Sequence, residues 1–209
     1  MRAVVLVGGA HGSLRALTGP APAQLLAVAE VPAIERVIRH LAGAGVNEVV
    51  LSMEHAPDAF IAAFPSGRCA GVAVTYAVEP VALDTAGAIR FAARRAGLDR
   101  EFIAVNGDVL TSIDLAALLD FHRSRRAEAT VALTGVDDPS PYGVVSTEPD
   151  GRVRAFLEKP APSQAPSRLV NAGVYVLEQA VLDRIAADRP VNVEREIFPS
   201  LVEAGSLYA

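Results

Sequence analysis

The sequence has one cysteine, Cys69, and one lysine, Lys159, among 209 residues; its other eighteen basic residues are arginine. A single cysteine excludes an internal disulfide framework and a cysteine-based zinc site. It also indicates a reducing compartment. Histidine is rare too: His40, His55 and His122 are scattered without carboxylates at ligand spacing, and we expect them on helix surfaces or in the core.

The sequence also lacks an excess of positive charge and a long apolar run. Its net charge is −5 and its isoelectric point is about 5.4, so no basic field is present to hold duplex nucleic acid. No stretch approaches 18 apolar residues free of charge, and the apolar run at residues 3–7 ends at Gly8. We therefore expect no membrane-spanning helix, no signal peptide and a cytoplasmic location, with neither nucleic acid nor a membrane as partner.

What is present is the composition of a folded domain. Hydrophobic residues make up 51% of the chain and charged residues 21%, which excludes a disordered tail. A chain of this length can bury about 70% of its unfolded surface without disulfides. No internal repeat and no clean linker interrupts the sequence, so residues 1–209 are expected to form a single domain.

Short apolar runs alternate with segments in which apolar residues recur at helical spacing. Strands are expected at residues 3–7, 48–53, 72–78, 102–105, 129–136 and 170–177. Helices are expected at residues 32–41, 57–64, from 85 onward, and at 114–126, 178–187 and 194–204. Residues 142–147 and 152–157 flank Pro149-Asp150-Gly151 and predict a hairpin. This alternation predicts an α/β fold with a mixed, mostly parallel central sheet.

Three segments stand where an α/β sheet places its ligands, at the carboxyl ends of strands or the start of a helix. They are Gly8-Gly9, Asp84-Thr85-Ala86-Gly87 and Asn106-Gly107-Asp108. Glycines after a strand let backbone N–H groups approach a phosphate. Asp108 at a strand end suits Mg²⁺, which takes one or two carboxylates and completes its shell with phosphate and water. A dinucleotide site of the Rossmann type is disfavoured, because Gly8, Gly9 and Gly12 lack the G-x-G-x-x-G spacing.

Taken in order, the motifs resemble those of the sugar-1-phosphate nucleotidyltransferases along essentially the whole chain. The first half carries Leu6-Val7-Gly8-Gly9, Leu14-Arg15, Leu17-Thr18, Glu79-Pro80, Leu83-Asp84-Thr85-Ala86-Gly87-Ala88 and Val105-Asn106-Gly107-Asp108. The second half carries Tyr142-Gly143-Val144-Val145, Phe156-Leu157-Glu158-Lys159-Pro160, Asn171-Ala172-Gly173-Val174-Tyr175 and Glu194-Arg195-Glu196-Ile197-Phe198-Pro199. Within the family, Phe121-His122, Ala129-Thr130-Val131 and Pro139-Ser140 make the chain most similar to the guanylyltransferases of mannose 1-phosphate.

The resemblance implies a Rossmann-like, three-layer αβα fold of the GT-A-like kind. It implies a nucleotide-binding half at about residues 1–136 and a sugar-binding half at about residues 137–209. The implied reaction is Mg²⁺-dependent: a sugar 1-phosphate, here mannose 1-phosphate, attacks the α-phosphorus of an NTP, here GTP, and yields an NDP-sugar and pyrophosphate. No covalent enzyme intermediate is needed, so catalysis would consist of positioning and charge neutralisation.

The resemblance also implies roles for individual residues. The implied nucleotide-binding residues are Leu6, Gly8, Gly9, Glu79, Thr85, Ala86 and Gly87. The implied sugar-phosphate-binding residues are Asn106, Gly107, Tyr142, Gly143, Glu158, Lys159 and Asn171. The implied catalytic residues are Asp108, Lys159 and Arg15, with Asp108 as the Mg²⁺ ligand. The chemistry of Lys159 agrees with this role, because a compact ammonium suits a phosphate.

The chain departs from the family in the loop after its first strand. The family reads Gly-Gly-x-Gly-Thr-Arg-Leu and then Pro-Lys-Pro, whereas this chain has His11 for the third glycine, Ser13 for the catalytic arginine and Ala23 for the catalytic lysine. Losing one such electrostatic donor typically costs ~10²–10³ in rate. Arg15 keeps its family position and could compensate in part.

Two hypotheses therefore stay open. The first is an enzyme that makes NDP-sugars, and the second is a catalytically silent regulatory or sugar-nucleotide-binding paralogue of such an enzyme. Family members usually continue past Leu207-Tyr208 to a strand with a second metal-binding aspartate, which we expect to be missing here. The expected partners are an NTP with a sugar 1-phosphate, or an NDP-sugar; a homo-oligomer and pairing with an active paralogue are both left open.

Overall fold

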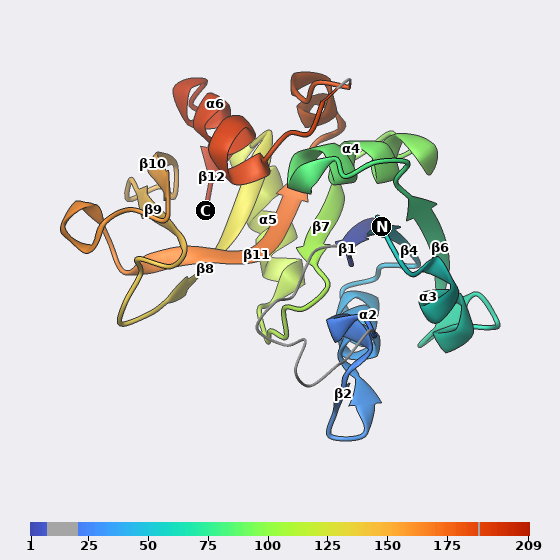
Figure 1. The fold of residues 1–209 in the computed structure, drawn as a ribbon. Helices are drawn as coiled ribbons and strands as arrows, with labels where there is room; N and C mark the ends of the chain where they lie inside the picture. The colour runs from blue at the N-terminus through green and yellow to red at the C-terminus, as the bar shows by residue number, and fades with distance from the viewer. Residues whose placement is uncertain (8–20, 188) are drawn as a thin grey trace.

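The computed structural model describes residues 1–7, 21–187 and 189–209, and Figure 1 shows their arrangement. Four predicted strands form the parallel centre of the sheet. They are β1 (Arg2–Leu6), β4 (Glu48–Met53), β6 (Val72–Val78) and β7 (Phe102–Asn106). β1 lies between β7 and β4, and β4 pairs with β6. Because these strands are parallel, their carboxyl ends meet at one edge of the sheet.

The strands that flank this centre pair mainly in antiparallel fashion. They are β5 (Arg68–Cys69), β8 (Ala129–Gly135), β9 (Gly143–Thr147), β10 (Val153–Glu158), β11 (Leu169–Leu177) and β12 (Leu207–Tyr208). The ten-stranded sheet has the order β10-β9-β11-β7-β1-β4-β6-β5, with β8 joining β11 and β12. A separate two-stranded hairpin pairs β2 (Ala27–Val28) with β3 (Val31–Pro32). The sheet is therefore mixed, and its parallel pairing is concentrated in the centre.

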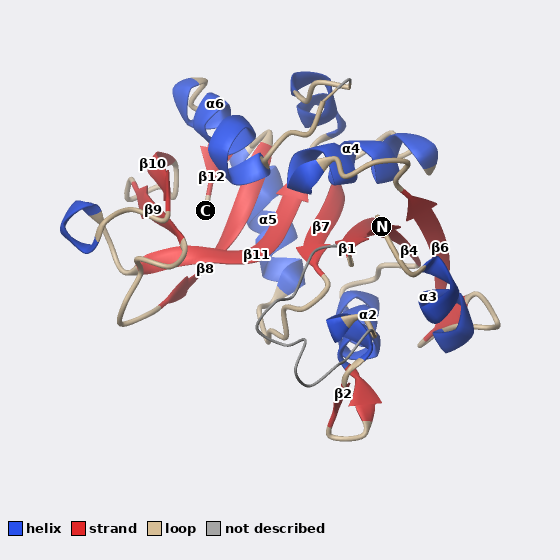
Figure 2. Cartoon of the chain, in the orientation of Figure 1, coloured by secondary structure: helices blue, strands red, loops and turns tan. Residues whose placement is uncertain are grey.

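Helices cover both faces of the sheet (Figure 2). One face packs against α2 (Ala33–Gly43), α3 (Pro57–Ala63) and α5 (Leu115–Arg125), and the other against α4 (Asp84–Arg95) and α6 (Phe198–Glu203). In α2 the residues predicted from helical spacing, Ile34, Val37, Ile38 and Leu41, are buried, and so is Ala33. The α/β, three-layer αβα architecture is thus confirmed. Within the described ranges, no helix has the length and apolarity needed to cross a bilayer.

The C-terminal segment departs from the expected helices. Residues 178–187 contain a 3₁₀-helix, Gln179–Arg184, and residues 194–204 divide into a π-helical turn, Val193–Ile197, and α6. Pro199 cannot donate a backbone hydrogen bond, and α6 accordingly begins with this proline in its first turn. Two further 3₁₀ turns, Ala23–Leu25 and Pro162–Gln164, and the two-residue strands were too short to be visible as a periodic pattern.

β11 carries the sheet from its parallel centre to the β9–β10 hairpin. Its residues 174–177 pair with β7, whereas Val170 pairs with Val144 of β9. A register shift between Asn171 and Tyr175, in the pairing with β8, accompanies this change of neighbour. The first half of β11 therefore runs past the carboxyl end of β7 and brings Asn171 to the edge where β1 and β7 end.

The β9–β10 hairpin turns at Pro149-Asp150-Gly151, as the sequence predicts. Glu148 N–H donates to the Arg152 carbonyl at 2.7 Å, and Gly151 adopts a φ of 87°, which suits glycine. The tip packs against α5 and the end of the chain: a Cβ on Gly151 would lie 2.6 Å from Phe121 Cζ, and Ala209 N–H donates to the Gly151 carbonyl at 2.9 Å. The hairpin is thereby anchored at its turn.

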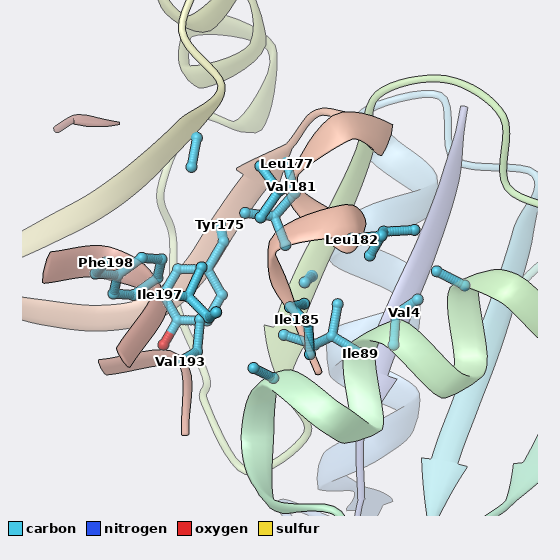
Figure 3. Close-up of a cluster of buried hydrophobic side chains, with 14 of the residues drawn as sticks. Val4, Ile89, Tyr175, Leu177, Val181, Leu182, Ile185, Val193, Ile197 and Phe198 are labelled. Atoms are coloured by element: carbon cyan, nitrogen blue, oxygen red, sulfur yellow. The ribbon is translucent and has the colours of Figure 1, made fainter. Parts of the chain in front are cut away.

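The apolar cluster on the α4–α6 face contains Tyr175, whose side chain is fully buried (Figure 3). Its ring meets that of Phe198 edge to face, with centroids 5.2 Å apart. Figure 3 shows the Tyr175 ring beside Ile197 and Phe198, with its hydroxyl oxygen near Val193. The packing of the ring therefore fixes where the hydroxyl lies.

Gly87, in the first turn of α4, permits a close approach that a methyl group would block. A Cβ there would lie 2.8 Å from Leu83 Cβ, so Gly87→Ala is expected to destabilise the fold by about 1–3 kcal/mol. Gly43→Ala is the control, because a Cβ there meets nothing within 4 Å, and helix propensity makes this change neutral or up to ~1 kcal/mol stabilising. Denaturant unfolding measures both variants; equal stability of the two would contradict the packing argument.

Candidate functional site

A cavity of about 190 Å³ lies at the carboxyl ends of β1, β4 and β6, beside the first turn of α4. It is lined by Leu6, Ser52, Glu54, Glu79, Ala82, Leu83, Asp84, Thr85 and Ala88. Three of the residues predicted to bind the nucleotide, Leu6, Glu79 and Thr85, thus share one cavity. We call it the first cavity.

Glu79 is the buried carboxylate of the first cavity, with 9% of its surface exposed. The Ser52 hydroxyl donates to Glu79 Oε1 at 3.1 Å, and Leu83 N–H donates to Oε2 at 3.3 Å. Burial raises the pKa of Glu79, and these two donors partly oppose the rise. A carboxylate has about four acceptor sites, so it keeps the capacity to accept hydrogen bonds from a ligand.

The turn that opens α4 contributes Leu83, Asp84 and Thr85 to this cavity. Ala86 and Gly87 of the same turn are buried and do not line it. The N–H groups of Ala86 and Gly87 donate to the Val191 carbonyl at 2.9 and 3.2 Å. Asp84 adopts a φ of 59°, a left-handed conformation that aspartate tolerates, and its Oδ1 accepts from Thr85 N–H at 2.6 Å. The turn is therefore tied to the 191–195 segment through its own backbone donors.

The Asn106–Asp108 turn closes the end of β7. Gly107 N–H donates to the Leu6 carbonyl at 2.8 Å, and a Cβ on Gly107 would lie 2.8 Å from the same oxygen. Asn106 lies against β11, because a Cβ on Gly173 would be 2.8 Å from Asn106 Nδ2. Asp108 is exposed at this edge. One exposed carboxylate that can share a cation with phosphate oxygens and water fits the coordination that Mg²⁺ takes.

The β9–β10 hairpin brings four predicted sugar-phosphate residues together. Lys159 N–H donates to the Tyr142 carbonyl at 2.9 Å, and Lys159 Nζ lies 3.8 Å from Glu158 Oε1. Position 143 requires glycine: a Cβ there would lie 2.8 Å from Phe156 Cζ and 3.1 Å from Glu158 Oε2. The hairpin thus holds a carboxylate beside an ammonium, which suit a sugar hydroxyl and a phosphate respectively.

A larger cavity, of about 630 Å³, adjoins this pair, and we call it the second cavity. It is lined by Phe156, Leu157, Glu158, Lys159, Pro160, Ala161, Gln164, Glu194, Arg195 and Pro199. Its wall therefore combines two carboxylates with two cations. Such a wall suits a ligand that carries both hydroxyl groups and a phosphate.

Asn171 is half-buried on β11, and hydrogen bonds fix its amide. Gly173 N–H donates to Asn171 Oδ1 at 2.8 Å, and Asn171 Nδ2 donates to Tyr175 Oη at 2.8 Å. Asn171 lines neither the first nor the second cavity. Contact between Asn171 and a sugar stays a prediction.

Some residues that the sequence singles out fall outside the described part of the chain. They are Gly8, Gly9, His11, Ser13 and Arg15, and the roles expected of them stay predictions. Ala23, by contrast, is described: it begins the 3₁₀ turn 23–25 and is 6% exposed. A buried methyl group thus occupies the position at which the family pattern has a lysine.

The sequence interpretation missed five polar residues that line the two cavities: Ser52, Glu54, Gln164, Glu194 and Arg195. Ser52 and Glu54 lie at the carboxyl end of β4, so the rule that placed the other candidates could have found them. Glu194 and Arg195 stood in a recognised family motif but were given no role. The local sequence contains no signal that Glu194 meets Thr85, a residue 109 positions away.

His122 is buried, as expected, but the expectation that no carboxylates surround it is wrong. Glu101 and Glu178 bring ligand-type atoms within 4.8 Å of one another and of the imidazole. Thr130 Oγ1 lies 2.8 Å from His122 Nδ1, Glu178 Oε1 lies 3.4 Å from Nε2, and Arg123 pairs with Glu101. Burial lowers the pKa of His122. These contacts give each of the three side chains a partner within the protein.

The fold and the two cavities define a three-layer α/β protein with ligand-binding cavities near the carboxyl edge of its parallel strands. The sequence profile of one family, nucleotidyl transferase, matches residues 2–209. The chain therefore belongs to the nucleotidyl transferase family.

Several curated relatives are named as guanylyltransferases of mannose 1-phosphate. The chain is 43% identical over 203 residues to mannose-1-phosphate guanylyltransferase of Mycobacterium tuberculosis, which covers 97% of this chain and 56% of the relative. It is 38% identical over 216 aligned positions to an Arabidopsis thaliana protein named probable mannose-1-phosphate guanylyltransferase 2, covering 100% of this chain and 58% of the relative. The chain thus spans somewhat more than half the length of these relatives.

Solved structures share the fold. A Bacillus anthracis structure, assigned as a glucose-1-phosphate thymidylyltransferase in complex with a sucrose, superposes with a TM-score of 0.86 at 23% identity, covering 100% of this chain and 85% of the other. A UDP-glucose pyrophosphorylase complexed with UDP-glucose gives a TM-score of 0.80 at 17% identity, with coverages of 97% and 87%. At these identities the likeness establishes the fold alone.

The buried Glu79 carboxylate makes a testable contribution to the pH dependence of stability. Its folded pKa is raised above 4.5, so its contribution is fully present below the unfolded pKa and is lost as pH rises through the folded pKa. Glu79→Gln removes this loss, and the stability of the variant relative to wild type is expected to increase from pH 4 to about pH 7. Urea unfolding across this range measures the effect; Glu203→Gln, at an exposed carboxylate, is the control, and parallel curves for all three proteins would contradict the assignment.

Proposed function

We propose that this chain is a sugar-1-phosphate nucleotidyltransferase domain that transfers a guanylyl group from GTP to mannose 1-phosphate and releases pyrophosphate. The observation that carries the proposal is the pairing of two cavities. The first holds Glu79 and Thr85, the second holds Glu158 and Lys159, and the hydrogen bond from Thr85 to Glu194, at 3.2 Å, joins their walls.

The division of the lining residues supports a nucleotide half and a sugar half. All residues of the first cavity come from positions 6–88, and all residues of the second come from positions 156–199. This agrees with a nucleotide-binding half at about 1–136 and a sugar-binding half at about 137–209. A donor nucleotide in the first cavity and an acceptor sugar phosphate in the second would be neighbours.

Glu79 supports guanine as the base. Guanine presents two adjacent donors, N1–H and the N2 amino group, which match the two oxygens of one carboxylate in a charge-assisted pair. Uracil and thymine present a single N–H between two carbonyl oxygens, which a carboxylate repels. The names of the curated relatives point to the same nucleotide.

In this proposal the residues of the chain act by positioning and charge. Glu158 accepts from sugar hydroxyls, and Lys159 orients the sugar phosphate so that one of its oxygens attacks the α-phosphorus in line while pyrophosphate departs with the bonding electrons. Asp108 is the residue that would hold Mg²⁺ together with substrate phosphates. Mg²⁺, when bound, supplies neutralisation of the triphosphate charge.

A second candidate function rests on Ala23. Its buried methyl group leaves position 23 without the cation that the family pattern places there. A chain with both cavities but without this charge fits a sugar-nucleotide-binding or regulatory paralogue of such an enzyme.

A pyrophosphate-release assay with Mg²⁺, GTP and mannose 1-phosphate separates the two candidates. Wild type is compared with a Ser13→Arg/Ala23→Lys variant, in which the new lysine stem can pass along apolar surface to place its charge in solvent. We expect the variant to be faster by ~10² or more. Turnover by wild type at ordinary enzymatic rates eliminates the silent candidate. If neither protein turns over while GDP-mannose still binds, the enzyme is eliminated.

Lys159→Met tests the sugar-phosphate assignment without requiring turnover. Removing the ammonium is expected to raise the dissociation constant for mannose 1-phosphate about tenfold or more, and to leave that for GTP within about threefold. Titration calorimetry measures both constants. Arg95→Met, at an exposed cation of α4, is the matched control and should change neither; an equal effect of the two variants would reject the assignment.

A further inference from the structure

The 191–195 segment joins the two cavities through several hydrogen bonds. On the side of the first cavity, Asn192 Nδ2 donates to Asp84 Oδ1 at 3.0 Å, and Val193 N–H donates to Thr85 Oγ1 at 2.9 Å. Arg195 N–H donates to Asn192 Oδ1 at 2.9 Å and holds that amide in place. On the other side, Glu194 and Arg195 form part of the wall of the second cavity. A single short segment therefore contacts both.

Glu194 is the residue of this segment that bonds in both directions. Thr85 Oγ1, in the wall of the first cavity, donates to Glu194 Oε2 at 3.2 Å. Tyr175 Oη, from the buried cluster under β11, donates to Glu194 Oε1 at 3.4 Å. Each oxygen of the Glu194 carboxylate thus accepts one hydrogen bond from a hydroxyl group, one from Thr85 and one from Tyr175.

On the β11 side, two successive hydrogen bonds are both donated toward Glu194. Asn171 Nδ2 donates to Tyr175 Oη, and the Tyr175 hydroxyl hydrogen is directed to Glu194. Because a tyrosine hydroxyl has one hydrogen, its acceptance from Asn171 and its donation to Glu194 are complementary. Asn171, one of the residues implied in sugar binding, therefore takes its amide orientation in part from Glu194.

Burial strengthens the constraint on this carboxylate. Removal from water raises the pKa of Glu194, and the nearby Glu158 and Asp84 carboxylates raise it further, while the Thr85 hydroxyl opposes the rise. The Tyr175 ring cannot adjust easily, because it is fully buried against Phe198. A shift of Thr85 therefore moves the Glu194 carboxylate relative to a hydroxyl oxygen that stays in place, so the hydrogen bonds of Glu194 to Thr85 and to Tyr175 depend on each other.

We propose that Glu194 is a positioning residue that couples Thr85, in the wall of the first cavity, to the second cavity and to the Tyr175–Asn171 pair of β11. A ligand that fixes Thr85 fixes the Glu194 carboxylate, which lines the second cavity and directs the hydrogen of the Tyr175 hydroxyl. The second ligand then meets a site that is already ordered, and binds more tightly. The choice of ligands rests on the proposed function; the coupling between the residues does not.

The coupling is measured with GDP and mannose 1-phosphate, a pair that lacks the donor triphosphate. Calorimetry gives the dissociation constant of mannose 1-phosphate with and without saturating GDP. We expect GDP to lower this constant at least fivefold in the wild-type protein. In Glu194→Ala the ratio is expected to fall to about one, and in Glu194→Gln, whose amide can still accept from Thr85 and bond Tyr175, it is expected to persist.

A control and three contrary outcomes complete this test. Glu203→Ala removes an exposed carboxylate from nearby α6 and should leave the ratio unchanged. A wild-type ratio of one, an unchanged ratio in Glu194→Ala, or a ratio in Glu194→Gln as low as that in Glu194→Ala would each overturn the proposal. The two Glu194 substitutions together separate the hydrogen bonds from the mere presence of a side chain.

A measurement without ligands keeps the coupling testable if the proposed function fails. Thr85→Val and Tyr175→Phe each remove one hydroxyl from Glu194, and their effects on the urea midpoint are compared with that of the double variant. We expect non-additive shifts in the wild-type background and additive shifts in Glu194→Ala. Additive shifts in both overturn the proposal. Failure of wild type to bind either ligand, with non-additive shifts retained, instead rejects the proposed function.

Discussion

Moving a carboxylate out of water is costly unless hydrogen-bond donors replace the water, and each cavity contains a carboxylate in this situation. Ser52 and the Leu83 N–H serve Glu79, whereas Thr85 and Tyr175 serve Glu194. The donors come from β4, from the start of α4 and from β11. The hydrogen bonds to these two carboxylates therefore hold the elements in place relative to one another. The same contacts that stabilise the fold also position the carboxylates at the cavities.

The sequence was most informative for elements that neighbouring residues define by themselves. The parallel strands, the hairpin at Gly151 and the turn at Asp108 were predicted because short apolar runs and glycine-containing turns can be recognised within a few consecutive residues. Ser52 was missed although it lies at a strand end, and Glu194 could not be placed because its partner Thr85 is 109 positions away. Contacts across such separations depend on the register of β11 and on the π-helical turn. Neither feature produces a periodic pattern of apolar residues in the sequence.

The departure at position 23 has a structural side as well as a chemical one. Ala23 is buried in a short 3₁₀ turn directly before the β2–β3 hairpin, so the chain has packed a small residue where a long cation would need a path to solvent. In the proposed assignment, the groups that bind the ligands and the missing cation of position 23 belong to different parts of the chain. The carboxylates and Lys159 that would recognise ligands stand on the main sheet and the segments attached to it, whereas the departures from the family pattern fall between residues 8 and 23.

The β9–β10 hairpin is fixed at its turn, where Gly151 leaves room for Phe121 and bonds the backbone of Ala209. Its opposite end carries Glu158 and Lys159 at the second cavity. The ribbon between them joins the turn to the second cavity, and along it Phe156 of β10 packs against Phe198 of α6, with ring centroids 5.1 Å apart. A substitution at Phe121 that displaces the turn should therefore also displace Glu158 and Lys159, although Phe121 lies at the far end of the ribbon and touches neither side chain.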